Sequence, residues 1–163
     1  MKKIIVIGCP GSGKSTFSRA LHSSTGIPLF HLDRMYWNAD QTTVPHALFL
    51  ERLSDTLRGS EWIIDGNYAS TMELRMQACD TVIFLDYPAE LCLKGVEERR
   101  GRPRSDLPWT ETGEDDAFLA FIQNYRLQNR PQVMELLTKY PDKQIFIFAN
   151  RQEADEFLTQ LQR

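Results

Sequence analysis

Residues that commonly bind metals or form disulfides are scarce in this chain. The 163 residues contain an odd number of cysteines, without the CxxC spacing of zinc sites: Cys9, Cys79 and Cys92. The three histidines share no ligand spacing and are predicted to be surface or core residues: His22, His31 and His46. We therefore expect reduced thiols, no disulfide framework and no metal held by protein ligands alone.

Long apolar runs are absent as well. No stretch approaches the roughly 20 apolar residues that a membrane-spanning helix needs. The segment from Met1 to Gly8 contains an apolar run that is too short for a signal peptide. We therefore expect a protein that has no membrane partner and works in the cytoplasm.

The chain also lacks an excess of basic residues. Its 19 Lys and Arg stand against 22 Asp and Glu, which gives a formal net charge of -3. Non-specific affinity for nucleic acids comes chiefly from phosphate neutralisation by Lys and Arg, so this balance argues against a nucleic-acid partner without excluding a local basic patch. Both a monomer and a homodimer remain open.

Short β-branched runs alternate with longer segments of helical period. We expect four clear strands and a weaker one: 3–7, 62–64, 81–85, 144–148 and, weaker, 28–32. Apolar residues three and four apart predict helices over 118–125, 133–140 and 154–161. Pro131 lacks an amide hydrogen and should open a separate second helix. The alternation predicts one α/β domain over residues 1–163, a parallel sheet with helices on both faces.

A glycine-rich segment directly after the first expected strand matches the pattern GxxxxGK[ST]. Its glycines let backbone N–H groups point at phosphate oxygens, while Lys14 reaches the β and γ phosphates and Ser15 offers a hydroxyl to Mg²⁺. The following helix adds its positive N-terminal end. The sequence therefore predicts binding of ATP with Mg²⁺ by a continuous run of residues: Gly8, Pro10, Gly11, Ser12, Gly13, Lys14, Ser15 and Thr16.

Other motifs separate the classes of phosphate-binding-loop (P-loop) protein. The chain lacks the [NT]KxD motif that GTPases use for guanine and the LSGGQ-like motif of ABC-type ATPases. Its apolar strands are followed by single carboxylates, Asp65 and Asp86, instead of the Asp-Glu pair usual in hydrolytic ATPases. These features favour a kinase, which must keep water out while a phosphoryl group passes to an acceptor.

Five segments carry a resemblance to a known family. They are the P-loop through Thr16, Leu32-Asp33 with Trp37 nearby, the run 62–68 (WIIDGNY), the run 84–88 (FLDYP) and the run 104–107 (RSDL). Together they resemble the adenylate-kinase-like proteins called DNA topology modulation proteins, or FlaR-related proteins, over nearly the whole chain. The resemblance implies the P-loop NTPase fold of nucleoside monophosphate kinases, with the P-loop strand in the middle of five parallel strands. It also implies a helical insertion on the acceptor side at about 34–60 and a lid at about 100–116.

Charged side chains follow two expected strands, at the edge of the sheet where open α/β folds bind ligands. Asp65 is predicted to hold a Mg²⁺-bound water beside Ser15, as the resemblance also implies; a plain turn residue is the alternative. Asp33 could accept the proton of a hydroxyl acceptor, or it could cap a helix while Trp37 packs in a core. The residues assigned to the acceptor are Asp33, Arg34, Trp37, Asp65, Gly66, Asn67, Tyr68 and Arg75.

Arginines crowd both sides of the expected lid. Guanidinium groups on a closing lid neutralise charge on the transferred phosphoryl group, and a solvated charge run or a nucleic-acid patch are the alternatives. The catalytic set is therefore Lys14, Asp33, Arg99, Arg104 and Arg126. The resemblance also leads us to expect an arginine four residues before Arg99, but Gly95 stands there. Contact with the adenine would then pass to Arg100 or to the segment around Asn150 and Arg151. Arg99 and Arg151 are assigned to the nucleotide.

The leading interpretation is a Mg²⁺-dependent phosphotransferase that moves the γ-phosphoryl of ATP to a nucleotide or nucleoside-like acceptor. We favour a nucleotide, because arginines outnumber carboxylates around the predicted cleft and Arg34 or Arg75 could grip its phosphate. Two other functions stay open. One is an ATP-binding regulator of DNA topology or gene expression, and the other is a slow ATPase switch whose lid movement is the output.

Overall fold

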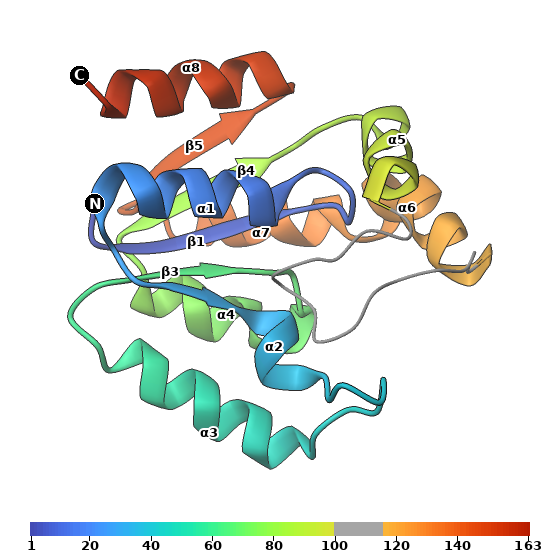
Figure 1. Cartoon of the computed structure of the whole chain (residues 1–163), viewed down its shortest axis with the longest axis horizontal. Helices are drawn as coiled ribbons and strands as arrows, with labels where there is room; N and C mark the ends of the chain where they lie inside the picture. Colours follow the sequence, from blue (N-terminus) through green and yellow to red (C-terminus); the bar gives the residue numbers. More distant parts are fainter. Residues whose placement is uncertain (100–115) are drawn as a thin grey trace.

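Five parallel strands form one sheet in the order β2-β3-β1-β4-β5 (Figure 1). The computed structural model describes residues 1–99 and 116–163. The strands are β1 (Lys3–Gly8), β2 (Leu29–His31), β3 (Trp62–Asp65), β4 (Thr81–Leu85) and β5 (Gln144–Phe148). The strand that leads into the P-loop lies in the middle, so the predicted α/β fold with a central β1 is confirmed.

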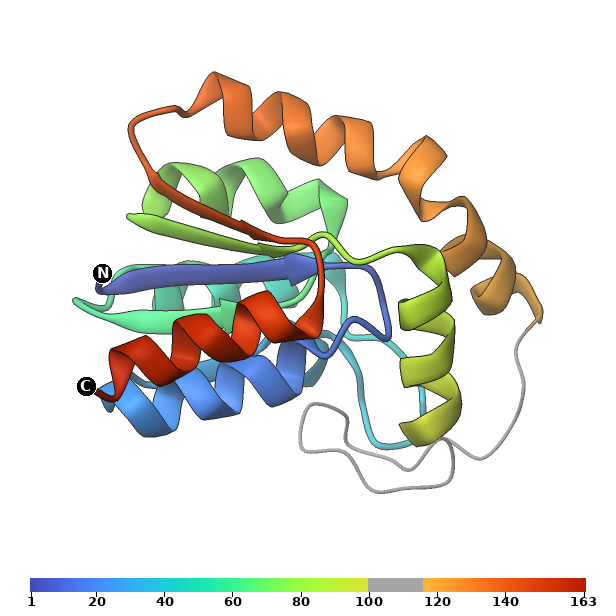
Figure 2. The same ribbon diagram turned by 90° about the horizontal axis from the view of Figure 1, so that it is seen from above.

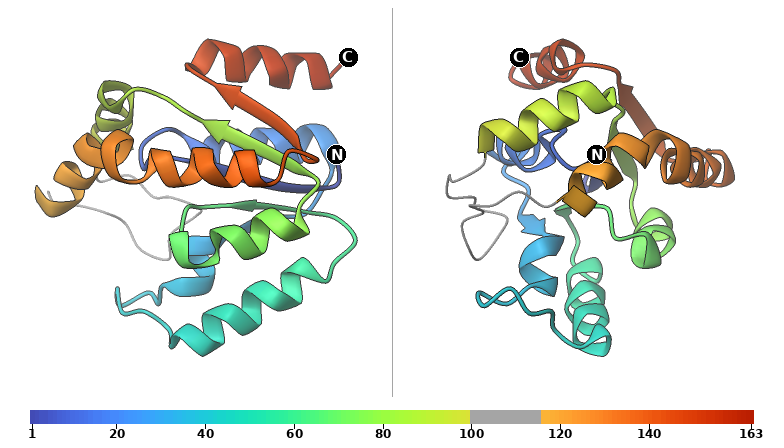
Figure 3. Two further views of the ribbon diagram at one scale, coloured as in Figure 1. Left: turned by 180° about the vertical axis from the view of Figure 1, so that it is seen from behind. Right: turned by 90° about the vertical axis from the view of Figure 1, so that its right-hand side faces the viewer.

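Helices cover both faces of the sheet (Figure 2). Their bounds are α1 (Lys14–Thr25), α2 (Leu32–Tyr36), α3 (His46–Leu57), α4 (Ala69–Ala78), α5 (Ala89–Arg99), α6 (Asp116–Gln128), α7 (Arg130–Lys139) and α8 (Arg151–Leu161). α1 and α8 lie on one face, and α3, α4 and α7 lie on the other (Figure 3). The result is a three-layer arrangement.

Strand residues alternate between two apolar cores because successive side chains point to opposite faces. On β1, Ile4 and Val6 pack in the core under α1 and α8, while Ile5 and Ile7 pack in the core under α3, α4 and α7. The central strands are buried on both faces, which explains their unbroken Ile- and Val-rich runs. β5 is an edge strand, and Ile147 on it is exposed.

The strand predictions hold at β4 and β5, whose observed bounds equal the expected ones. β2 is shorter than expected, because Leu32 already begins α2. Asp33 therefore lies in the first turn of a short helix instead of at the end of a strand. The predicted break near Pro131 is present, since α6 ends at Gln128 and α7 starts at Arg130.

Two further expectations concern the segments around the site. Between β2 and β3 the chain forms α2 and α3, within the range 34–60 where a helical insertion is expected. The expected lid at 100–116 lies almost wholly outside the described residues. In the part of the chain that the structure describes, no helix has both the length and the apolar character needed to cross a membrane.

All strands run in the same direction, so their carboxyl ends meet at one edge of the sheet. The P-loop follows β1 at this edge, the loop of residues 66–68 follows β3, and Asp86 follows β4. Helices α5 and α6 lie beyond the same edge (Figure 2). The fold therefore gathers the predicted functional segments in one place, as open parallel sheets do with their ligand sites.

Candidate active site

The P-loop turns sharply between β1 and α1. Gly11 and Gly13 have φ values of 85° and 91°, a left-handed conformation that glycine adopts without strain. The amide of Ser12 donates to the carbonyl of Cys9 at 3.0 Å and closes the turn. Since α1 begins at Lys14, the loop lies at a helix N-terminus, where unpaired amides favour an anion.

Lys14 folds back over the loop. Its Nζ donates to the carbonyl of Gly8 at 2.9 Å and to that of Cys9 at 3.3 Å. A phosphate group is a stronger partner for an ammonium group than a neutral carbonyl, so it would compete for these hydrogen bonds. Ser12 is buried, and its hydroxyl has no hydrogen-bond partner among the described residues. The loop thus offers a cation and a buried hydroxyl to a ligand.

The two hydroxyls after Lys14 contact an arginine of the same helix. Arg19 donates from Nη1 to Ser15 Oγ at 2.8 Å and from Nη2 to Thr16 Oγ1 at 3.2 Å. Arg19 is not among the predicted site residues, although its spacing of three and four residues from these hydroxyls along a helix indicates contact. It places a further positive charge beside the residues expected to meet the nucleotide and Mg²⁺.

The loop of residues 66–68 contacts the P-loop directly. Asn67 Nδ2 donates to the Gly8 carbonyl at 2.5 Å, and Asn67 Oδ1 accepts from the Gly8 amide at 3.1 Å. Gly66 has a φ of 130°, and a Cβ at this position would lie 2.9 Å from the Leu32 side chain. The turn therefore needs glycine, and it aims the amide of Asn67 at the first residue of the P-loop.

Arg75 holds the same loop from within the protein. Its side chain is fully buried, and its guanidinium donates to the carbonyls of Gly66 at 3.0 Å, of Asn67, and of Tyr68 at 3.1 Å, while Nε donates to Thr71 Oγ1 at 3.3 Å. Desolvation lowers the pKa of Arg75 to about 9. A guanidinium with these partners is not presented to a ligand. Loop carbonyls use its donors in this structure, and the assignment of Arg75 to an acceptor phosphate stays a prediction.

Asp65 is paired with a histidine. His31 Nδ1 lies 2.7 Å from Asp65 Oδ2, and the two side chains are 10% and 6% exposed. The pair forms because β2 and β3 are neighbours in register, with His31 opposite Asp65. His31, predicted to be an ordinary surface or core residue, is thus a part of the site that its sequence spacing does not reveal.

Asp33 and Tyr68 meet across the acceptor side. The Tyr68 hydroxyl donates to Asp33 Oδ1, and a side-chain hydrogen bond links Tyr68 with Trp37. Tyr68 has a φ of 38°, in the left-handed region that a tyrosine rarely adopts. Burial, followed by the negative charge of Asp33, raises the pKa of Tyr68 well above its usual value, so the hydroxyl keeps its proton. Asp33 therefore contacts a permanent hydrogen-bond donor.

An aromatic cluster surrounds Asp33 and Tyr68. The Tyr36 ring lies 5.4 Å from Trp37, 5.3 Å from Phe49 and 5.0 Å from Tyr68 between centroids, all in edge-to-face geometry. Phe49 is buried, whereas Tyr36, Trp37 and Tyr68 keep part of their surface exposed. Trp37 is thus partly buried: one part of its ring packs against Tyr36 and another part stays exposed. Arg34, on the same short helix α2, is exposed.

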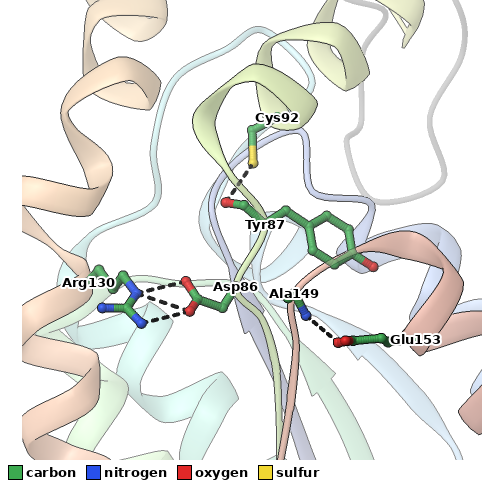
Figure 4. A network of polar contacts seen from close by, with 6 residues as sticks. All are labelled: Asp86, Tyr87, Cys92, Arg130, Ala149 and Glu153. Carbon is green, nitrogen blue, oxygen red and sulfur yellow. Dashed lines mark hydrogen bonds and ion pairs between the residues drawn. The ribbon is translucent and has the colours of Figure 1, made fainter.

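Asp86 forms an ion pair with a residue far along the chain (Figure 4). Arg130 donates from Nε and Nη2 to both carboxylate oxygens of Asp86, at 2.9 to 3.0 Å. Arg130 opens α7, and Asp86 follows β4, so the pair fixes the start of that helix to the sheet edge. Asp86 is therefore occupied by a protein partner in this structure.

Gly95 lies against the P-loop. A Cβ on Gly95 would stand 2.1 Å from the Gly11 carbonyl oxygen, and one on Gly11 would stand 1.9 Å from the Cys92 carbonyl oxygen. With this backbone no side chain fits at either glycine, which explains why no arginine stands at position 95. Arg151 reaches the same place from α8, since its Nη2 would lie 3.3 Å from a Gly95 Cβ. Its Nη1 lies 4.0 Å from Glu98 Oε2.

The helix that carries Arg151 begins with reciprocal capping. Asn150 Oδ1 accepts from the Glu153 amide at 3.0 Å. Glu153 Oε2 accepts from the Ala149 amide at 2.6 Å (Figure 4). This cap fixes the first turn of α8 and hence the backbone of Arg151.

Of the predicted lid cations, Arg99 and Arg126 lie on α5 and α6, and Arg104 falls outside the described residues.

The donor set suits a Mg²⁺ ion that arrives with a nucleotide. Mg²⁺ binds oxygen ligands and is usually held by one or two protein oxygens together with phosphates and water. Ser15 and Asp65 offer a hydroxyl and a carboxylate from segments that adjoin β1, since Asp65 pairs in register with Val6. No group of three His, Cys, Asp or Glu side chains within residues 1–99 and 116–163 could hold a metal. The oxygens of Ser15 and Asp65 are of the kind that Mg²⁺ binds, while in this structure Ser15 Oγ accepts from Arg19 and Asp65 Oδ2 contacts His31; their assignment to the ion stays a prediction.

Comparison with known proteins places the fold. Neither protein-family models nor curated proteins give a match to the sequence. A solved shikimate kinase from Bacteroides thetaiotaomicron is 19% identical, with a TM-score of 0.57 over 98% of this chain and 95% of that chain. A shikimate kinase from Acinetobacter baumannii in complex with shikimate is 16% identical, with a TM-score of 0.66 over 99% of this chain and 90% of that chain.

At these identities the likeness concerns the fold alone. It supports the P-loop NTPase α/β fold with a five-stranded parallel sheet, of the type that nucleoside monophosphate kinases share. The narrower resemblance to DNA topology modulation proteins stays a prediction, since no family model matches.

Proposed function

We propose that this protein is an ATP- and Mg²⁺-dependent phosphotransferase that acts on a small-molecule acceptor. One observation carries the proposal: Asn67, in the predicted acceptor-side loop, is hydrogen-bonded to Gly8 of the P-loop at both its amide and its carbonyl. Phosphoryl transfer depends mainly on positioning two substrates and neutralising charge between them. Direct contact between a donor loop and an acceptor loop suits that task.

The residues of the donor side have separate roles in this proposal. Lys14 leaves the carbonyls of the P-loop to contact the β and γ phosphates. Ser15 and Asp65 would hold Mg²⁺, Asp65 by way of a water. Bound Mg²⁺ offsets negative charge on the phosphates. Arginines then stabilise the transferred group: Arg99, Arg104 and Arg126.

The acceptor side supports a small molecule. Asp33, Tyr68 and Trp37 form a hydrogen-bonded group with aromatic walls beside the sheet edge, and the P-loop lies next to it through Asn67. A shikimate kinase of the same fold forms a complex with shikimate, a small molecule. This likeness supports a small-molecule acceptor here.

A screen of candidate acceptors with ATP and Mg²⁺, in which ADP release is followed, tests the proposal. We expect release that depends on one class of acceptor and disappears in Lys14→Ala. Release that is independent of every acceptor would instead indicate an ATPase switch. Binding to DNA that weakens steeply as salt rises, without transfer to any small molecule, would favour the regulatory alternative.

A further inference from the structure

We infer that the phosphoryl acceptor is an alcohol, a hydroxyl on a ring-bearing molecule such as a nucleoside, and not an existing phosphate as in a nucleoside monophosphate. The inference rests on the proposed function and names the substrate class of the same site. It reverses the preference that the sequence suggests. That preference rested on the number of arginines around the cleft, on the fold resemblance, and on Arg34 or Arg75 as an acceptor-binding cation, and the donors of Arg75 are used by loop carbonyls in this structure.

A phosphate acceptor needs cations, since two anionic substrates must approach each other. Arg75 cannot supply one. It is 0% exposed and its guanidinium donates to the carbonyls of residues 66, 67 and 68. Turning it towards a ligand would leave three loop carbonyls without this partner and would release the loop that bears Asn67. The buried arginine positions the site instead of binding its substrate.

The groups that do line the acceptor side suit a neutral hydroxyl. Asp33 is a carboxylate, and Tyr68 holds one of its oxygens through a hydroxyl that stays protonated. An alcohol can donate its own proton to Asp33, whereas a phosphate dianion placed there would meet a like charge. Asp65, the second carboxylate at this edge, has His31 as its partner. In the described part of the chain, Tyr68 thus presents Asp33 as a hydrogen-bond acceptor, and Arg34, exposed on α2, is an acceptor-side cation whose replacement is part of the test below.

The aromatic side chains beside Asp33 indicate which kind of group carries the hydroxyl of the acceptor. Tyr36, Trp37 and Tyr68 are partly exposed. The Tyr36 ring packs edge to face with Trp37, Phe49 and Tyr68 at 5.0 to 5.4 Å, and the Tyr68 ring lies tilted against Phe49 at 5.4 Å. Aromatic rings bury apolar or planar groups and leave polar tips for hydrogen bonds. A hydroxyl carried on a ring matches this combination of a carboxylate with aromatic neighbours.

The transfer step balances with the residues present. The alcohol oxygen forms a bond to the γ phosphorus while the bond from that phosphorus to the β–γ bridging oxygen breaks. Asp33 accepts the hydroxyl proton and later passes it to solvent. The products are a phosphate monoester and ADP, with one proton released. No oxidant, reductant or further reactant is needed.

Matched pairs of acceptors test the inference. Nucleosides and cyclic polyols would each be offered beside their own monophosphates, with ATP and Mg²⁺, and the products followed by phosphorus NMR. We expect turnover only with unphosphorylated members. Asp33→Asn should lower kcat by roughly 10² to 10⁴, the span usual for loss of a general base, with ATP affinity unchanged. Asp55→Asn, an exposed aspartate on α3, serves as the matched control.

The outcomes of this experiment distinguish failure of the alcohol assignment from failure of the proposed function. Turnover of a monophosphate, or near-normal turnover by Asp33→Asn, overturns the alcohol assignment while leaving the proposed phosphotransferase in place. Arg34→Ala separates the cases further, because a phosphate acceptor would show a large rise in KM and an alcohol would not. Absence of any phosphorylated product, with ATP still bound in a Lys14-dependent way, overturns the proposed function and the inference with it. Circular dichroism and retained ATP binding establish that Asp33→Asn is folded.

Discussion

Asn67 and Lys14 donate to the same atom, the carbonyl oxygen of Gly8, from distances of 2.5 Å and 2.9 Å. One donor comes from the acceptor-side loop and the other from the first turn of α1. When Lys14 turns to a phosphate, the Asn67 hydrogen bond can remain and keep the P-loop in place. The backbone of Gly8 is thus the point where both halves of the proposed site are joined.

Replacement of Asn67 tests this joint. Asn67→Asp keeps an oxygen for the Gly8 amide but loses the donor, and its carboxylate would face the Gly8 carbonyl oxygen. We expect the free energy of unfolding to fall by about 1–3 kcal/mol and ATP affinity to fall about tenfold, because a part-buried hydrogen bond is replaced by repulsion. Urea unfolding and an ATP titration measure both effects. Asn124→Asp, an exposed asparagine of α6, is the control, and equal behaviour of the two variants would contradict the joint.

Arg75 gives a second prediction, on stability. Arg75→Met removes the guanidinium and leaves the carbonyls of residues 66–68 without it, which should cost at least about 3 kcal/mol at roughly 1–3 kcal/mol per unsatisfied group. Arg75→Lys should recover only part of this free energy of unfolding, since a lysine ammonium lacks the fixed fork of donors by which the guanidinium contacts three carbonyls. Chemical denaturation at neutral pH measures the series.

The same pair of variants separates a positioning role from substrate contact. If Arg75 bound an acceptor phosphate, Arg75→Lys would retain stability and mainly raise the acceptor KM. We expect instead that Arg75→Lys lowers the free energy of unfolding of the ligand-free protein and changes the acceptor KM less. A fully stable Arg75→Met variant would refute the positioning role.

Gly95 leads to a third prediction. A Cβ at this position would lie 2.1 Å from the Gly11 carbonyl oxygen, so Gly95→Ala must push α5 and the P-loop apart. We expect a loss of roughly 1–3 kcal/mol, as for overpacking of a well-packed site, together with weaker ATP binding. Gly26→Ala is the matched control: φ there is 74° but nothing lies within 4 Å of a new Cβ, so only conformational strain of about 1 kcal/mol applies. Similar losses in both variants would contradict the close contact.

The parts of the fold that the sequence predicts are those that depend on short segments of the chain. The bounds of β4 and β5 follow from β-branched and aromatic runs that begin after polar turn residues, Asp80 and Lys143. The P-loop is identifiable because its glycines, Lys14 and Ser15 act through the backbone and through short contacts within one segment. Such features need no knowledge of the rest of the chain.

Contacts between distant segments are the part of the site that the sequence does not predict. Burial of Arg75 depends on a turn at Gly66 that directs three carbonyls inward, and the His31 pair depends on the register of β2 with β3. Neither geometry leaves a spacing in the sequence. A charged residue is usually exposed, and nothing in the sequence around Arg75 indicates that it is buried. At Leu32 the local preference was ambiguous, and the structure begins a helix there.

Lys14→Ala gives the fourth prediction. The side chain contacts carbonyls of the loop and is not part of either apolar core, so the variant should fold with little loss of stability. ATP affinity should fall at least about 100-fold, since a charge-assisted partner of two phosphates is removed. Calorimetric titration measures the affinity, with Lys94→Ala on the exposed surface of α5 as control. A folded variant with normal ATP affinity would remove the basis of the proposed function.

The fifth prediction concerns Arg151 and uses two ligands that differ only in the presence of a nucleoside. Gly95 offers no side chain, and the Arg151 guanidinium lies beside it, over the backbone that contacts the P-loop. If Arg151 contacts the adenine, Arg151→Ala should weaken ATP binding about tenfold, in line with the loss of a stacked guanidinium worth up to about 2 kcal/mol. Binding of inorganic tripolyphosphate should stay unchanged.

Comparison with Lys14→Ala gives this experiment its internal reference. Lys14 is expected to contact phosphates, so its loss should weaken both ligands in equal proportion. Arg151→Lys keeps the charge but loses the planar group, and it should resemble Arg151→Ala if stacking matters and the parent protein if charge alone matters. Glu98→Gln removes the nearby carboxylate, 4.0 Å from Nη1, and should leave ATP affinity the same or slightly higher because it frees the guanidinium. Weaker tripolyphosphate binding in Arg151→Ala would assign the residue to the phosphates and leave the adenine to another group.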